Sequence, residues 1–330
     1  MKTKLLVSVL FLSSISFAQE SVNYEVIKDE PIEPKISVNL DLFNIDINTK
    51  VSRLQVDNIS FNIGTFGHVM PLNFVGIDFN IHKAWLTLGK IGYKDYPGNL
   101  EMNVGGFFFF TDRTTIKQKT RVVLKTQRGT YNGKDVTTTT FIEVPAKIQK
   151  RFGVRAGLYQ KSGPFNFRDF SKDPKDNFAV EPPFEYTKYS SFGLYGGLMW
   201  RRISNIIIKD PKYGQSGTSG ATDIYMEAMV IPVNKFTALE QEYTGDKNVT
   251  SMVHNVGKES PIGFRIGFKK YQVEKKAVTG RKFGRAGIAE FGYRPYIGWF
   301  ANAGVAITLV KSSKPLSFGG KEKTTETAPQ

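Results

Sequence analysis

The sequence predicts an all-β protein, an antiparallel transmembrane β-barrel of about twelve strands, from three observations. Apolar residues alternate with small or polar residues along much of the chain, which is the period of a β-strand. The opposite face carries many glycines and isolated charges instead of the mixed polar residues of a solvent-facing sheet. After residue 18, the chain has no run of about 18 to 20 apolar residues for a transmembrane helix. A soluble β protein also alternates, and the sequence leaves it open as the alternative.

The clearest alternation lies in the last predicted strand, residues 297–310. Every second residue from Ile297 to Leu309 is apolar, whereas most of the positions between them hold small or polar residues such as Asn302. A barrel wall in lipid needs an apolar outer face and tolerates a polar inner face. We therefore expect these residues to face lipid: Ile297, Trp299, Ala301, Ala303, Val305, Ile307 and Leu309.

The first 18 residues have the composition of a secretory signal peptide. Lys2 and Lys4 precede a short apolar run, and Ser16 and Ala18 are small residues where signal peptidase reads the chain. We expect cleavage after Ala18, export, and localisation in the bacterial outer membrane. The predicted organisation is a signal peptide at 1–18, a periplasmic N-terminal segment at 19–34, a barrel at 35–310 and a flexible polar tail at 311–330.

Twelve candidate strands follow from the alternation, and bacterial single-chain barrels have even numbers of strands. The region 83–128 also accepts other divisions, so about ten to fourteen strands fit the sequence. With both chain ends in the periplasm, residues 161–183 and 233–259 become two long extracellular loops. The candidate strands are 35–46, 51–64, 71–81, 83–93, 98–111, 114–128, 136–160, 184–208, 219–232, 260–273, 281–294 and 297–310.

The inner face of this predicted barrel carries acids and bases in nearly equal numbers. Such a balance predicts ion pairs that brace and fill the lumen. The alternative is a narrow polar passage whose selectivity the arginines set. The expected lumen-facing charges are Asp41, Asp78, Glu101, Arg151, Arg155, Arg201, Asp223, Glu227, Arg265, Lys269 and Glu290.

Residues 117–144 predict a long β-hairpin with a basic face. Asn132 and Gly133 form a tight-turn signal between two strands. At period two, Lys117, Lys119, Arg121 and Lys125 would share one face, and four cations are too costly to place in lipid. We expect either a solvated ribbon or a docking surface for lipopolysaccharide phosphates, acidic glycans or an acidic protein.

Composition restricts the partners and the chemistry. The net charge of +15 favours anionic partners, and export makes nucleic acid the least expected of them. The absence of cysteine rules out disulfides and thiolate metal sites. The sequence has no GxSxG, HExxH or phosphate-binding glycine motif, so we expect no catalytic residues, no metal and no cofactor.

Several segments resemble outer-membrane β-barrel proteins of Bacteroidota. They are SFAQE at the end of the signal, RFGVRAGLY (151–159), SSFGLYGGLMWRR (190–202) and FGYRPYIGWFANAGVAITL (291–309). The resemblance implies an outer-membrane address and no particular activity. One departure is the polar tail after Val310, because many barrels end on an aromatic residue.

Three functional classes follow from this interpretation. The first is a non-catalytic structural or partner-binding component of an envelope complex, in contact with outer-membrane lipid, lipopolysaccharide and an envelope protein. The second is a narrow, porin-like channel for small polar or anionic solutes. The third and most remote is a barrel enzyme. The balanced lumen charge and the basic hairpin favour the first class.

Overall fold

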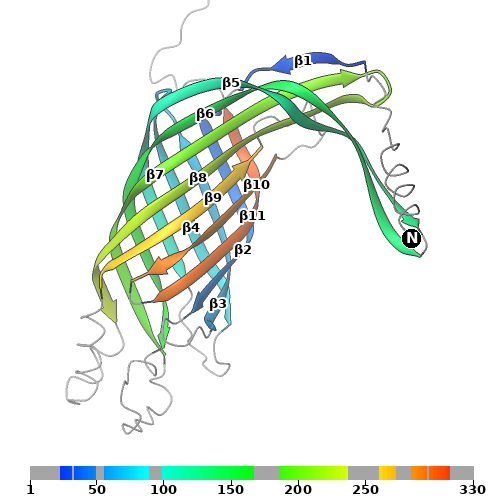
Figure 1. Cartoon of the computed structure of the whole chain (residues 1–330). Coiled ribbons are helices and arrows are strands. Elements are labelled where there is room, and N and C mark those ends of the chain that lie inside the picture. Colours follow the sequence, from blue (N-terminus) through cyan, green and yellow to red (C-terminus); the bar gives the residue numbers. More distant parts are fainter. Residues whose placement is uncertain are drawn as a thin grey trace, which may run out of the picture.

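The computed structural model describes residues 23–31, 33–49, 56–88, 99–131, 133–166, 186–236, 260–272, 284–295 and 297–312. All regular structure in these residues is β-strand, and ten long strands form a closed barrel (Figure 1). Within the same ranges, no helix is long and apolar enough to cross a membrane. The barrel strands are β2 (Ile36–Thr49), β3 (Val56–Val69), β4 (Val75–Leu88), β5 (Leu100–Tyr131), β6 (Lys134–Asn166), β7 (Tyr186–Asp210), β8 (Gly214–Phe236), β9 (Ile262–Tyr271), β10 (Gly284–Arg294) and β11 (Gly298–Ser312).

Every neighbouring pair of barrel strands is antiparallel, and the ring closes between β7 and β8. The order around the barrel is β7, β6, β5, β4, β3, β2, β11, β10, β9 and β8. A short additional strand, β1 (Glu25–Asp29), pairs with β7 outside this ring. It lies within residues 19–34, for which the sequence analysis predicted no strand. Closure removes the open sheet edges that would otherwise expose backbone polar groups.

The strand count is ten, not twelve, because two predicted breaks are absent. The candidates 71–81 and 83–93 are one strand, β4, which continues past Lys83 with a bulge opposite Phe61 and Asn62. The candidates 98–111 and 114–128 are also one strand, β5. The polar residues Thr111 and Asp112 look like a turn, but they continue the ladder opposite Phe152 and Arg151. The predicted loops 161–183 and 233–259 fall mostly outside the described residues, although β6 runs on to Asn166 and β8 to Phe236.

A β-bulge in β2 changes which residues face the interior. Leu42 and Phe43 are consecutive and both exposed, whereas Asp41 and Asn44 on either side are buried. The register on both neighbouring strands shifts at the same point. One extra residue reverses the side-chain alternation beyond it. Even-numbered residues such as Asp46 therefore join the inner face after the bulge.

Four strands continue past the barrel at the end where β2 begins and β11 ends, which we call the terminal end. The β4–β5 ladder ends at Val75 and Phe108, but β5 and β6 remain paired as far as Tyr131 and Lys134. Figure 1 shows this β5–β6 hairpin projecting sideways from the rim and then bending. We call residues 111–150 the arm. The hairpin predicted around Asn132 and Gly133 is thus present, with φ of 73° at Gly133.

The base of the arm packs on the extension of β7. Val122, Val144 and Ala146 of the arm meet Ile206 and Ile208 of β7, and none of the five is exposed to solvent. Leu124 and Ile142 pack against this group. An isolated two-stranded hairpin is marginally stable in water, so this apolar contact anchors the arm to the barrel.

Two glycines of the barrel wall leave room for the hydroxyl group of a tyrosine on the neighbouring strand. Gly105, Gly157 and Tyr195 are neighbours across β5, β6 and β7. A Cβ on Gly105 would lie 2.3 Å from the Tyr195 hydroxyl and 2.5 Å from the Ala156 carbonyl oxygen. A Cβ on the next residue, Gly106, would have the Gly76 carbonyl oxygen, 3.6 Å away, as its nearest atom outside the adjacent residues.

Gly105→Ala should therefore destabilise the barrel, whereas Gly106→Ala should not. We expect a loss of about 1–3 kcal/mol for Gly105→Ala, since overpacking forces side chains and backbone to shift. The measurement is the urea midpoint of the folded chain, followed by heat-modifiable gel mobility. Equal midpoints for the two variants would contradict the close approach of Tyr195 to the wall.

Candidate functional site: a filled lumen and a basic arm

The structure places all eleven expected lumen-facing charges inside the barrel. Each has at most 7% of its surface exposed. They lie on β2, β4, β5, β6, β7, β8, β9 and β10, so the interior polar groups come from nearly every strand. The contacts join ten of them into three clusters, which follow one another along the barrel axis, and Asp41 belongs to a separate polar group.

The central cluster joins Arg155, Arg265, Glu227 and Asp78 across the lumen. The Glu227 carboxylate forms ion pairs with Arg155 Nη1 at 2.8 Å and Arg265 Nη2 at 2.6 Å, and it accepts a hydrogen bond from Arg265 Nε at 2.8 Å. Arg155 also binds Asp78, whose carboxylate lies 3.5 Å from Lys269 Nζ. These contacts span β4, β6, β8 and β9, so they close the middle of the barrel from opposite walls.

Further groups contact the two central guanidinium groups. Arg265 Nη1 donates to Asn103 Oδ1 at 3.0 Å and lies 3.5 Å from Glu290 Oε1. The Tyr225 hydroxyl also donates to Glu290. Arg155 Cζ lies 4.2 Å from the centre of the Tyr225 ring. A buried guanidinium needs such partners because its unpaired burial costs several kcal/mol.

The loop-side cluster lies nearer the end opposite the arm and contains Asp46, Glu101, Lys161 and Arg294. Arg294 donates to Asp46 at 2.9 Å and to Glu101 at 2.7 Å. Lys161 Nζ lies 2.5 Å from Asp46 and 3.1 Å from Glu101. Two cations therefore share two carboxylates, and the local charge cancels.

The terminal-side cluster closes the barrel next to the arm. Arg201 binds Asp223 in a bidentate pair, with both N–O distances 2.7 Å. Glu33, from the segment before β2, reaches into this mouth and binds both Arg201 and Arg151. Arg151 also donates to Asp112 at the base of the arm, at 2.7 Å. The segment after β1 thus forms part of the lumen filling.

A smaller polar group lines the wall made by β2, β3, β4 and β11. His82 Nε2 lies 3.0 Å from Asp41 Oδ2. Asn44 donates to Asn302 Oδ1 at 2.8 Å and accepts from Asn62 at 3.1 Å. The contacts bridge strands that are far apart in sequence and therefore help to hold the closed register.

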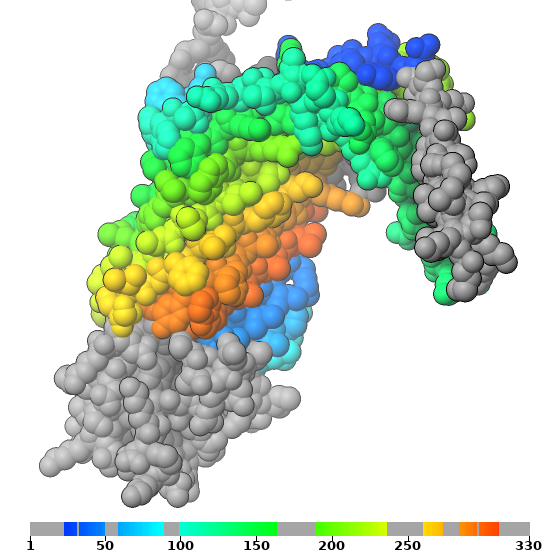
Figure 2. Space-filling view, viewed as in Figure 1, coloured from blue at the N-terminus to red at the C-terminus, as the bar shows by residue number. Residues whose placement is uncertain are grey.

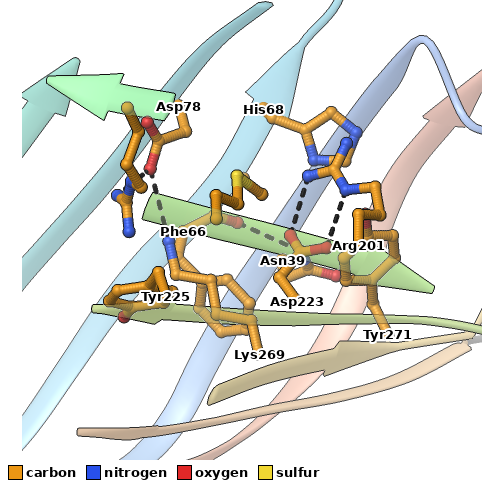
Figure 3. Close-up of a pocket in the computed structure, with 12 residues that line it drawn as sticks. Asn39, Phe66, His68, Asp78, Arg201, Asp223, Tyr225, Lys269 and Tyr271 are labelled. Carbon is orange, nitrogen blue, oxygen red and sulfur yellow. Dashed lines mark hydrogen bonds and ion pairs between the residues drawn. The ribbon is translucent and has the colours of Figure 1, made fainter. Parts of the chain in front are cut away.

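A small cavity lies between the central and terminal-side clusters. Figure 3 shows Lys269, Arg201 and His68 around it, with Asp78 bound to Lys269 and Asp223 bound to Arg201. Its volume of about 10 Å³ gives room for about one water molecule. Within the described ranges, no group of three or more His, Asp or Glu residues is placed to hold a metal ion.

Sequence reasoning missed four charged residues of these clusters. Asp46 joins the inner face only because of the bulge at Leu42 and Phe43. Glu33 lies outside any strand, so alternation gives no signal for it. Lys161 follows the predicted end of its strand at 160, and Arg294 ends the predicted strand 281–294, so neither was counted as an inner charge.

Six of the seven residues expected to face lipid lie on the outer face of β11, and Ile297 lies just before this strand. Ala301, Ala303, Val305 and Leu309 are exposed, and Ile297, Trp299 and Ile307 are partly exposed. On the inner face of the same strand, Phe300, Asn302, Ala306 and Thr308 are buried.

The four cations of the arm do not share one face. All four are exposed, but β5 has register shifts between Lys117 and Thr120 and between Val123 and Lys125. Lys117 and Lys125 lie opposite Ala146 and Thr140, whereas Arg121 lies opposite Glu143. Because even and odd positions of β6 point to opposite faces, positive charge lies on both faces of the arm. Arg121 covers the Phe141 ring, with its Cζ 3.5 Å from the ring centre.

Comparison with protein-family models, curated proteins and solved structures finds no match to this chain. The geometry of the lumen, the outer wall and the arm is therefore what indicates the function of the chain.

Glu227→Gln should destabilise the folded barrel strongly, because it leaves Arg155 and Arg265 without their shared carboxylate. Breaking a buried ion pair on one side costs about 3–5 kcal/mol. The control is Glu143→Gln, which removes an exposed arm carboxylate and should cost less than about 1 kcal/mol. Urea midpoints of the two variants test this. A Glu227→Gln midpoint equal to that of the control would mean that the central cluster does not stabilise the barrel.

Proposed function

We propose that the chain is an exported, integral outer-membrane barrel with a closed lumen, which serves as a structural or partner-binding component of the bacterial envelope. The observation that carries the proposal is the contrast between the two sides of the wall. The inner side buries matched charges, and the outer side exposes apolar residues. The arm at the terminal end supplies the surface for a partner.

The outer apolar band has the height that a membrane requires. On β7 the outward residues from Phe192 to Trp200 are apolar or glycine, and Ser190 and Arg202 bound them. Eight residue steps span about 26 Å along a strand. A tilt of about 40° reduces this to roughly 20 Å, close to the apolar band of known membrane barrels. Exposed apolar residues of β4, β5, β6, β8, β9, β10 and β11 continue the band around the barrel.

Aromatic side chains gather at both rims of this band. Trp299 stacks on Phe291 with 5.4 Å between ring centres, next to Tyr293. At the opposite rim, Phe152 lies between Phe110 and Trp200 at 4.8 and 4.9 Å. Aromatic girdles at the two lipid interfaces are typical of membrane barrels. They support insertion with the arm outside the lipid.

The packing of the lumen argues for a binding or structural role over a channel. A water-filled passage would leave its lining side chains accessible to water, whereas the guanidinium groups of Arg201, Arg265 and Arg294 are almost fully buried. Asp223 and Glu227 are paired with an arginine of the neighbouring strand, and Glu101 is paired with Arg294 from the opposite wall. Selectivity in charged pores uses rings of one sign, and these clusters combine both signs.

The position of the arm favours a protein partner over lipopolysaccharide. The arm projects from the same end as the start of β2 and the end of β11. The two longest connections, 167–185 and 237–261, join strands at the other end. Long loops are typically extracellular, so the arm lies on the periplasmic side. Lipopolysaccharide occupies the outer leaflet and is out of its reach.

Val305→Arg should impair membrane insertion, and Ile116→Arg should not. The two side chains have similar exposure, 67% and 62%, but Val305 lies in the band and Ile116 on the arm. An arginine facing lipid costs about 2–4 kcal/mol near the bilayer middle. The measurement is the fraction that folds into liposomes and resists a protease. If both variants insert as well as the unchanged chain, the band does not face lipid.

In a planar bilayer, the inserted chain should pass no steady current. Heat-modifiable migration on a gel serves as the control that the protein is folded. A steady current whose ion selectivity changes with Arg155→Gln or Arg265→Gln would contradict the closed lumen. The narrow-channel alternative would then replace the proposed function.

A further inference from the structure

The outer edge of β5 is open along most of the arm. Beyond Phe108, the described residues give β5 a single ladder partner, β6. β8 approaches this edge around Arg121, where Thr218 Oγ1 donates to the Arg121 carbonyl oxygen at 3.3 Å. Toward the tip, residues 125–131 are exposed on both faces. An open edge presents backbone donors and acceptors that can pair with another strand.

This edge strand carries charge of one sign. Six cations and no acids lie between Arg113 and Tyr131. The paired strand β6 mixes both signs, with Asp135 and Glu143 among its lysines. Like charges directly opposite each other destabilise a sheet, so a second copy of this strand is a poor partner. An acidic strand is the complementary one.

The chain itself has an example of such pairing beside the arm. Residues 19–34 contain five acids and one lysine. Their strand β1 adds to the edge of β7, with Glu25 opposite Lys209. Asp29 Oδ1 accepts from the backbone N–H of Lys147 on the arm at 2.7 Å. An acidic extended segment is therefore already held at this end of the barrel by strand addition.

The cations of β5 lie on both faces of the arm, which fits an added β-strand as the partner better than a flat anionic surface. The register shifts place Lys117 and Lys125 on one face and Arg121 on the other. A membrane surface would meet the cations of one face at a time. An added strand directs its side chains alternately to both faces, so its acids can meet both sets.

We propose that the open edge of β5, from Arg113 to Tyr131, captures an extended acidic segment of a second envelope protein as an added β-strand. The proposal rests on the proposed function, because it identifies the kind of partner that the arm takes. Backbone hydrogen bonds supply affinity, and the cations select acidic segments. Figure 2 shows that the arm stands clear of the barrel wall, which leaves space beside it.

The test uses the full chain folded in detergent micelles and a labelled peptide of about ten residues in which Glu and Thr alternate. We expect the peptide to bind, as measured by fluorescence anisotropy. A peptide with Gln in place of Glu should bind at least about tenfold more weakly, as the loss of several cross-strand charge pairs requires. A peptide of the acidic sequence with consecutive N-methylated residues should not bind, because it lacks the backbone donors for both edges.

Two triple variants with the same change in net charge locate the site. Lys119→Gln, Lys125→Gln and Arg128→Gln together remove cations of the open edge strand. Lys134→Gln, Lys147→Gln and Lys150→Gln together remove cations of β6. We expect the first triple to weaken peptide binding about tenfold and the second to change it by less than about threefold.

Each other result would overturn strand addition. Equal binding of the N-methylated peptide would mean that charge alone attracts it, and equal effects of the two triples would mean that the β5 edge is not the site. Recruitment of the chain by anionic vesicles without peptide binding would identify a lipid surface instead. These results are separate from the proposed function as a whole, which the insertion and conductance measurements test without any peptide.

Discussion

The rest of the structure depends on the mutual neutralisation of charges inside a closed wall. Among the described residues, eight carboxylates and seven Lys or Arg side chains are buried in the barrel: Glu33, Asp41, Asp46, Asp78, Glu101, Asp223, Glu227 and Glu290 with Arg151, Arg155, Lys161, Arg201, Arg265, Lys269 and Arg294. Taking one ion out of water costs several kcal/mol, so each needs partners across the lumen. Several of those contacts, such as Lys269 with Asp78 and Arg294 with Glu101, join strands that are distant in sequence. The ion pairs that neutralise the buried charges therefore also hold the ring of strands closed.

Alternation along single strands was enough to identify eleven of these fifteen inner charges. Arg151 and Arg155 lie four residues apart on a regular part of β6, and their side chains both point inward. The same reasoning failed where backbone geometry interrupts the period. The bulge at Leu42 and Phe43 brings Asp46 inside, and the register shifts of β5 divide the arm cations between two faces. A bulge is one extra residue with no distinctive composition here, so pattern analysis has nothing to detect.

The number of strands was harder to predict for a different physical reason. Polar residues within an alternating segment can mean that the strand ends in a turn. They can also mean that the strand continues beyond the barrel wall. Thr111 and Asp112 are of the second kind, since β5 continues into the arm opposite Phe152 and Arg151. Only the pairing with β6 separates the two cases, and the sequence of β5 alone does not contain that pairing. Glu33 could not be predicted because it lies outside any strand and meets Arg151 and Arg201 only in the folded chain.

The arm and the lumen are connected through one arginine. Arg151 binds Glu33 in the mouth of the barrel and Asp112 at the base of the arm. The strand just before Glu33, β1, holds the extension of β7 on which the arm packs. Ordering of the N-terminal segment therefore stabilises both the closed mouth and the base of the arm. Among the described residues, these contacts hold the base of the arm and do not reach its tip. The open β5 edge toward Tyr131 would therefore need a partner strand to be stabilised to the same degree.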